Sequence, residues 1–432
     1  MNRTMWTSRV FCMKGKVRRI PARRVAGAIA LVLLACTVLS ADLPAFAGSG
    51  EKSARDRGIR RGPVRIRLLD VALDYVRSAQ VIETESFGAR SRTLIVDFKE
   101  PQRVLSTLEG ERGGILSVGN HYFPPSCWSI PHEMGFERWK EYTIESVGKK
   151  RRNSSFLFTG ADMSNLSLQR KQFGDLTVYA LVTAGVESNA MRASREEGLF
   201  YEPGTINIVL LTNGRLTSRA MCRTVIAATE AKTAALQDLD VRSAGQPLRL
   251  QATGTGTDEM VVVEGAGKRI DVAGGHSRMG ELIARAVYDG VREAVRKQNG
   301  IVNPRSVMER LKERKIDLRR LVVNGTGSVV DGASIDRLLL RAEAVLSKRR
   351  YASFIESALA LSDAYESGSI GDLEAFRKWC GDMAREIAEG EPGPDADYVG
   401  SGDIPVVLRM SLNAILSGVF GKEKDEEGEG RP

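Results

Sequence analysis

Residues 204–258 constrain this chain more than any other segment, because short polar signatures alternate there with apolar runs. The segment opens with GTINI at 204–208, passes through EAK at 230–232 and ends with ATGTGTD at 252–258. Glycine has no Cβ and threonine carries a hydroxyl, so such loops bring backbone N–H groups and hydroxyls close to a ligand. These small polar loops would pack poorly in a hydrophobic core. They predict a binding or catalytic site built between strands.

The net charge of +9 is concentrated at one end of the 432-residue chain. Residues 1–47 carry eight basic side chains and one acidic side chain, which leaves +2 for the rest. A charge this close to neutral gives no electrostatic reason to expect a polyanion as partner. We therefore expect no nucleic acid among the partners.

The N-terminus has the order of an export signal. Basic residues end at Arg24, an uncharged apolar run covers residues 25–41, and Ala45-Phe46-Ala47 gives a small-residue cleavage pattern. The sequence thus predicts a signal over 1–47, a linker over 48–63 and a periplasmic or other extracytoplasmic protein. The alternative is a membrane anchor formed by residues 25–41, at the short end of what spans a bilayer.

Apolar runs and helical periods alternate between residues 64 and 300. Strands are expected at 94–98, 176–182, 205–211 and 260–263, with Pro101 ending the first and Gly113-Gly114 marking a turn. Helices are expected from the N-cap Thr217 to about Leu239 and over 281–297. The alternation predicts an α/β or α+β domain over 64–300, layered around a mixed sheet.

The composition changes after residue 300. The pattern over 301–390 is mostly helical, and 391–432 holds a Gly/Pro/Asp-rich stretch, a short apolar helix at 404–420 and a charged tail. We expect a smaller, mostly helical C-terminal region. The sequence identifies no partner for it.

The helix through residue 230 divides into two faces. At 100° per residue, Thr229, Glu230, Lys232 and Thr233 fall within an arc of about 160°. The opposite face holds only alanines, at positions 227, 228, 231, 234 and 235. The polar arc faces either solvent or a site, and its position between two other polar signatures favours the site.

Three further features carry chemistry. The Gly254-Thr255-Gly256-Thr257-Asp258 loop is either a tight turn or a ligand loop, and it matches neither a Walker loop nor a dinucleotide fingerprint. Asn189 follows a buried strand, where α/β folds place ligand contacts, although an Asx turn is the alternative. His276 lies in a glycine-rich loop before a helix, as an acid–base group or a cap.

Taken together in their order, these clusters resemble the adenosylcobinamide amidohydrolase family. The elements of the resemblance are TAG at 183–185 with Asn189-Ala190, GTIN at 204–207, EAK at 230–232, TGTGTD at 253–258 and a glycine–histidine element at His276. The resemblance covers about residues 85–298, and 103–106, 113–114, Asn120 and 159–163 are also similar. An extra Glu187 and the export signal depart from the family pattern.

The resemblance implies hydrolysis of the amide that joins aminopropanol to a propionate side chain of (adenosyl)cobinamide. The products are cobyric acid and aminopropanol, in corrinoid salvage. The corrinoid is then a substrate, no organic cofactor is expected, and a corrinoid transport system is a candidate partner. The alternative function is an exported carrier that binds corrinoids without cleaving them.

Amide hydrolysis needs an activated nucleophile, oxyanion stabilisation and protonation of the leaving amine. We assign Glu230 or Asp258 as general base and His276 as acid. Lys232, Asn189 or the backbone amides of 254–257 would hold the oxyanion.

Two variants of this scheme remain open. In the covalent one, Thr255 or Thr257 is the nucleophile. In the other, Asp258, Glu230 and His276 hold a divalent metal, which the spacing does not demand. Asn189, Asn207, Gly254, Thr255, Gly256 and Thr257 complete the set as substrate-binding residues.

Overall fold

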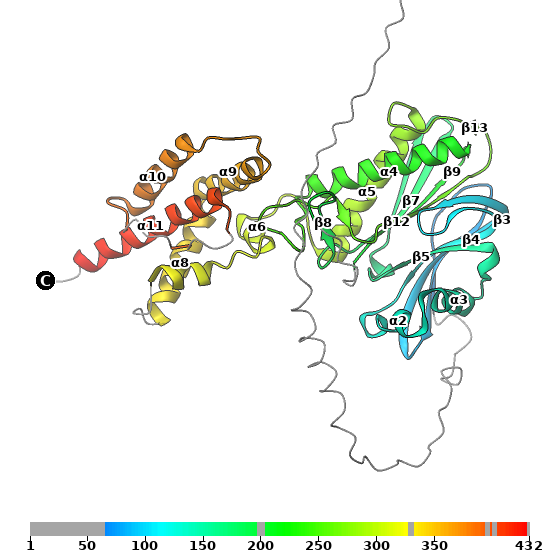
Figure 1. Cartoon of the computed structure of the whole chain (residues 1–432), viewed down its shortest axis with the longest axis horizontal. Helices are drawn as coiled ribbons and strands as arrows, with labels where there is room; N and C mark the ends of the chain where they lie inside the picture. The colour runs from blue at the N-terminus through cyan, green and yellow to red at the C-terminus, as the bar shows by residue number, and fades with distance from the viewer. Residues whose placement is uncertain (1–64, 197–203, 327–331, 394–397, 400–403, 430–432) are drawn as a thin grey trace, which may run out of the picture. The chain divides into compact units, whose positions relative to one another are not determined.

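Figure 1 shows the computed structural model of the chain, which describes residues 65–196, 204–326, 332–393, 398–399 and 404–429. The chain divides into residues 1–57 and 58–432, and all described residues belong to the second unit. The predicted signal at 1–47, its anchor alternative at 25–41 and the linker at 48–63 lie outside the described residues. Within the described ranges, no helix has the length and apolar character needed to cross a bilayer.

A mixed, curled sheet forms the first part of the fold. Its main path runs β1-β2-β3-β12-β9-β7-β6, with β4 beside β3 and β5 beside β4. Strands β9 and β12 are parallel, as are β4 and β5, and the other pairs in this sheet are antiparallel. The strands of this sheet are β1 (Arg65–Leu68), β2 (Val76–Ser86), β3 (Ala89–Ser106), β4 (Gly110–Tyr122), β5 (Ser154–Thr159), β6 (Ser167–Phe173), β7 (Leu176–Ala184), β9 (Ile206–Thr212) and β12 (Glu259–Val263).

Smaller elements connect and cover this sheet. Two short ribbons pair β8 (Ala190–Met191) with β11 (Gly254–Thr255) and β10 (Arg215–Leu216) with β13 (Arg269–Ile270). The helices α2 (Ile130–Met134) and α3 (Phe136–Ser146) lie beside β4 and β5 in Figure 1. Single 3-10 turns are η1 (Pro125–Cys127), η2 (Arg151–Asn153) and η3 (Met163–Asn165).

Strand β3 is longer than the sequence predicts. It continues through Pro101 to Ser106, so Pro101 does not end it. The pairing with β4 shifts register between Asp97 and Gln102, and such a bulge accommodates a residue that cannot donate to the ladder. Gly113 and Gly114 likewise lie inside β4, at a second register shift, and the predicted turn there is wrong.

The two long helices of the α/β part form as predicted. Helix α4 (Ser218–Asp238) starts at the N-cap Thr217, whose side chain accepts from the N–H of Ala220. Helix α5 (Arg278–Asn299) buries its predicted apolar stripe against β7. A Cβ on Gly290 would lie 2.7 Å from Cγ2 of Val182, so this glycine lets the helix approach the strand closely.

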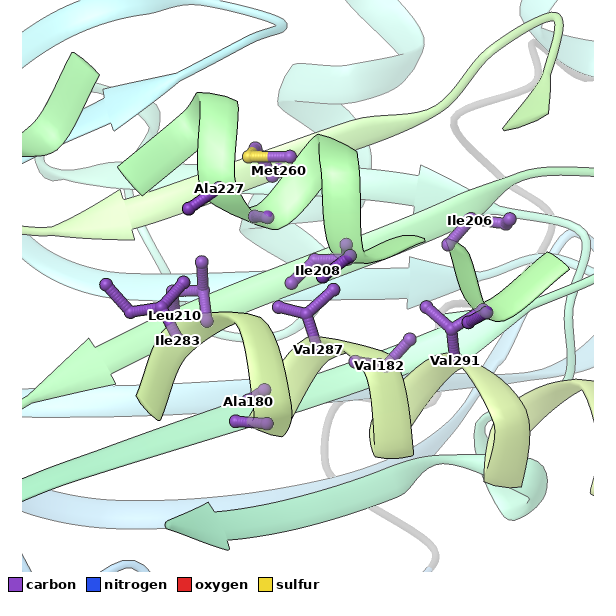
Figure 2. Packing of buried hydrophobic residues seen from close by; sticks show 14 of the residues in the cluster. Ala180, Val182, Ile206, Ile208, Leu210, Ala227, Met260, Ile283, Val287 and Val291 are labelled. Atoms are coloured by element: carbon purple, nitrogen blue, oxygen red, sulfur yellow. The ribbon is translucent and has the colours of Figure 1, made fainter. Parts of the chain in front are cut away.

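One hydrophobic cluster joins these helices to the sheet. Side chains from alternate positions of β7 and β9 meet those of α5, with α4 beside them (Figure 2). Because side chains alternate along a strand, the other positions of β9, including Val209 and Leu211, enter a second cluster on the opposite face. This alternation decides which face each polar residue of β9 and β12 occupies.

The C-terminal region is helical, as predicted. Its cluster of buried side chains is drawn from residues 307–419, with Leu248 packed against it. The helix predicted at 404–420 is present but continues into the charged tail. The helices are α6 (Val307–Glu313), α7 (Leu318–Thr326), α8 (Gly332–Ser347), α9 (Arg349–Glu366), α10 (Glu374–Ala388) and α11 (Val406–Glu429). The chain thus has an α/β fold with a mixed sheet, followed by a helical C-terminal region.

Candidate functional site

Polar side chains gather at one edge of the curled sheet. This edge is formed by the first residues of β9 and β12 and by the last residues of β4, β5 and β7. It is where Asn120, Thr183, Asn207 and Asp258 lie, and the ribbon of β8 and β11 brings Asn189 and Thr255 there as well.

Asp258 is the most densely bonded residue of this edge. Its Oδ1 accepts from the Thr255 hydroxyl at 2.6 Å and from the N–H of Ile206 at 3.1 Å. Its Oδ2 accepts from the N–H of Thr255 at 3.0 Å and from the ammonium of Lys232. A carboxylate has about four acceptor positions, and all are used here. The ion pair is largely enclosed, with side-chain exposures of 9% for Lys232 and 16% for Asp258.

Gly254 makes room for this ion pair. A Cβ at position 254 would lie 2.3 Å from Oδ2 of Asp258 and 2.6 Å from Nζ of Lys232. Both contacts are shorter than any side chain tolerates, so the backbone passes over the pair only because the residue is glycine. The sequence predicts Gly254 as a residue that brings the backbone close to a ligand, and in the structure it brings the backbone close to two charged groups of the protein itself.

Asn189 joins the loop to the first residues of β9. Its Nδ2 donates to the carbonyl of Gly204 at 2.8 Å, and its backbone carbonyl accepts from the N–H of Gly256 at 3.3 Å. The hydroxyl of Thr257 donates to the same Gly204 carbonyl at 3.1 Å. Asn189, Gly256 and Thr257, which the sequence predicts as substrate-binding residues, therefore belong to one hydrogen-bonded unit.

Asn207 belongs to a chain of buried amides and hydroxyls. It is fully buried, and its Nδ2 donates to Oδ1 of Asn120 and to the carbonyl of Phe158, both at 2.9 Å. Asn120 in turn donates to the hydroxyl of Thr183 at 2.9 Å. Satisfied polar chains of this kind fix the relative positions of the strands that carry them. Here they tie β4, β5, β7 and β9 together at the site.

Comparison with known proteins identifies the family. The model of the family described as CbiZ, adenosylcobinamide amidohydrolase, matches residues 73–303. This chain belongs to that family.

A curated relative is similar over about half of this chain. The uncharacterized protein MJ1613 of Methanocaldococcus jannaschii is 40% identical over 238 residues, which cover 51% of this chain and 92% of the relative. Among solved structures, the PH0078 protein from Pyrococcus horikoshii OT3 is 13% identical, covers 56% of this chain and 91% of its own, and has a TM-score of 0.30. That score is too low to support a conclusion.

Glu230 is the first predicted site residue of this amidohydrolase-family domain that the structure does not bring to the edge. Its side chain is exposed on α4, whereas Lys232 is buried. Thr233 also turns inward and donates to the carbonyl of Thr253 at 3.0 Å. The predicted polar arc is therefore only partly buried: Lys232 and Thr233 face the protein, whereas Thr229 and Glu230 face solvent. The alanine face is present except at Ala234, which is exposed.

His276 is the second predicted site residue that does not lie at this edge of the sheet. It is exposed, and a Cβ on Gly274 would lie 3.5 Å from its ring and 3.3 Å from Nε of Arg223. Arg223 precedes Lys232 by nine residues on α4, which is about 13 Å along the helix axis. His276 thus lies at the far end of α4, and Ser277 supplies the N-cap of α5.

The proposed metal ligands are not assembled, because Asp258, Glu230 and His276 lie in three different places. Among the described residues, no group of three or more His, Cys, Asp or Glu side chains is arranged to hold a metal ion. Cys127, Cys222 and Cys380 are free thiols. His121 is buried against Thr93, and burial lowers its pKa to about 3, which keeps the ring neutral.

Glu259 also lies at this edge, although it is not among the residues predicted from the sequence. It pairs in register with Asn207 across the parallel strands β9 and β12. Burial raises the pKa of its carboxyl to about 7, with the neighbouring carboxylates of Glu109 and Asp258 adding to the rise. The sequence feature that could have identified Glu259 is an acidic residue at the start of an otherwise apolar strand, EMVVV at 259–263. It directly follows the more prominent TGTGTD.

Proposed function

We propose that this chain hydrolyses the aminopropanol amide of (adenosyl)cobinamide, giving (adenosyl)cobyric acid and aminopropanol. Two observations support the proposal. The family match covers residues 73–303, which is all of the α/β part except β1. The observation that carries it is the hydrogen bond between the Thr255 hydroxyl and Asp258, 2.6 Å long and beside the ammonium of Lys232.

This geometry favours Thr255 as the nucleophile. A hydroxyl is a weak nucleophile unless a base within hydrogen-bond reach takes its proton, and Asp258 is such a base. Asp258 as a base toward a free water is less favoured, because its acceptor positions are all occupied by protein donors. Of the variants that the sequence leaves open, the covalent one fits these contacts best.

The steps balance without a co-reactant other than water. The Thr255 Oγ–H proton moves to Asp258 while Oγ bonds to the amide carbon, and the carbonyl becomes an oxyanion. The C–N bond then breaks, and the aminopropanol nitrogen takes the proton from Asp258. Water then hydrolyses the resulting ester: its OH joins the corrinoid acyl carbon and its other hydrogen restores the Thr255 hydroxyl. The released carboxylic acid loses its proton to the aminopropanol amine.

Lys232 is suited to stabilise the oxyanion. Its ammonium has three N–H donors, of which one is directed at Oδ2 of Asp258. A positive charge in an enclosed setting stabilises a developing negative charge more strongly than it would in water. The buried amides of Asn189 and Asn207 hold the surrounding loops and have a supporting role in binding.

Product analysis tests the proposal. Purified mature protein is incubated with cobinamide, and aminopropanol and cobyric acid are measured by mass spectrometry, with and without chelator. Thr255→Val should lose at least a hundredfold in turnover, whereas Thr255→Ser should keep measurable activity. Wild-type protein that binds cobinamide but releases no aminopropanol would instead support the carrier function.

We also propose that the enzyme acts outside the cytoplasm, on the strength of the signal pattern in residues 1–47. Cell fractionation followed by N-terminal sequencing tests this. A mature protein that begins at Gly48 would support a cleaved signal, and an intact N-terminus in the membrane fraction would support the anchor.

A further inference from the structure

Glu259 has no part in the chemistry above, yet it lies at the same edge. Its register partner is Asn207, and both side chains occupy the face of the sheet opposite to Asp258. Val209 and Val261, two positions further along each strand, are buried in the cluster on that face. Met260 lies in the cluster of the α4 and α5 face, so Asp258, two positions before it, shares that face.

The peptide of Phe158 joins Glu259 to Asn207. Its carbonyl accepts from Nδ2 of Asn207 at 2.9 Å, and its N–H lies close enough to the Glu259 carboxyl to favour the charged form. Within the described part of the chain, β5 pairs only with β4. Asn207 and Glu259 therefore meet the unpaired edge of β5, and they hold it against β9 and β12.

One oxygen of Glu259 is left without a partner. Among the described residues nothing donates to its Oε2, although the atom is buried. An ionised oxygen in that position forfeits hydration without gaining a hydrogen bond, which disfavours the charged form. The raised pKa of Glu259, about 7, agrees with this contact pattern.

The charges facing Glu259 are already paired with one another. Lys140 of α3 forms an ion pair with Glu109, and both side chains are almost fully buried. Arg112 also contacts Glu109 at 2.9 Å. On its own strand, Asp258 is paired with Lys232. An ionised Glu259 would therefore add an uncompensated negative charge one residue from Asp258.

We propose that Glu259 is a positioning residue of the hydrolytic site and that it works in its protonated form. The inference rests on the proposed function. When neutral, Glu259 holds β5 and the Asn207 amide in place and leaves the positive charge of Lys232 available to the oxyanion. When ionised, its negative charge opposes the charge that develops on the substrate carbonyl. The proton is exchanged with solvent.

The test is a pH profile of kcat/KM for cobinamide from pH 5.5 to 9. Wild-type activity should fall above pH 7, by about tenfold for each further unit, as the protonated fraction falls. Glu259→Gln mimics the neutral carboxyl and should lack this decline, so it should exceed the wild type about tenfold at pH 8. Glu264→Gln, just beyond the other end of β12 and paired with Arg103 in the wild type, is the matched control.

The results for Glu259→Gln and for the wild type test the inference and the proposed function separately. A folded Glu259→Gln protein with the wild-type decline, or with no activity at any pH, overturns the inference. If the wild type releases no aminopropanol, the proposed function fails by itself. In that case, NMR titration of the Glu259 carboxyl still shows at which pH the side chain ionises in the folded protein. Ionisation near pH 4.5 would overturn the protonated form, and ionisation near pH 7 would support it.

Discussion

Lys232 and Asp258 form an enclosed ion pair although 26 residues separate them, and the pair lies directly against the Cα of Gly254. Helix α4 supplies the lysine and the loop before β12 supplies the aspartate. The pair therefore links the helix to the glycine–threonine loop that carries Thr255.

Gly254→Ala should disrupt this arrangement. The added methyl group would lie 2.3 Å from Oδ2 of Asp258, so either the carboxylate or the loop must shift. A displacement of this size at a catalytic group costs on the order of a hundredfold in turnover. Gly113→Ala is the matched control, because a Cβ there meets nothing within 4 Å. Equal activity of the two variants would contradict the role of the ion pair.

The sequence predicts the helix but not its exposure. Glu230 and Lys232 are two positions apart and stand near opposite limits of the predicted polar arc. Helical periodicity groups them, whereas the sheet against which α4 packs separates them. The position of that sheet depends on long-range pairing, so the sequence could not decide which of the two is buried.

The sheet edge was predictable only in part. Asn189, Asn207 and the 254–258 loop could be placed together because each adjoins a predicted strand. The contribution of Asn120 depends on the parallel pair β4–β5, which curls over the ends of β9 and β12. Nothing local in the sequence of β5 signals that pairing. The sequence also could not place His276, because its position depends on long-range packing. The turn at 273–277 packs near Arg223, at the end of α4 away from Lys232 and Asp258.

Glu230→Gln and His276→Ala should each keep turnover within about twofold of the wild type. Both side chains are exposed and lie outside the hydrogen-bonded unit around Asp258. Surface substitutions of this kind also change stability little. Steady-state rates of aminopropanol release give the answer. A hundredfold loss in either variant would restore the assignment made from the sequence.

Lys232→Met should destabilise the fold by about 2–4 kcal/mol, because it leaves the enclosed carboxylate of Asp258 without its cation. Asp258→Asn should also destabilise it. The double variant Lys232→Met/Asp258→Asn should lose less than the sum of the two, since neither charge is then left unpaired. Urea unfolding of the four proteins measures the coupling. Strict additivity would mean that the pair contributes nothing.

Asn207→Leu should cost about 2–3 kcal/mol. The variant leaves Oδ1 of Asn120 and the carbonyl of Phe158 without the donor that both now share. Asn213→Leu is the comparison, because Asn213 is only half-buried, at the turn just beyond the other end of β9, where its amide hydrogen-bonds to the backbone of Asp175 and Thr177. A smaller loss for Asn207→Leu than for Asn213→Leu would show that the buried amide chain is not important for stability.

The stability of the fold should depend on pH through Glu259. Its pKa is about 7 in the folded protein and about 4.5 as a free side chain, so the folded state binds the extra proton between these values. The stabilisation from that proton is complete below pH 4.5 and is lost as pH rises to about 7. The difference amounts to roughly 3 kcal/mol at most. Glu259→Gln lacks this dependence. The free energy of unfolding of the variant minus that of the wild type, measured in urea, should therefore increase from pH 4.5 to 7 and stay constant above pH 7. A constant difference across this range would mean that Glu259 titrates normally in the folded protein.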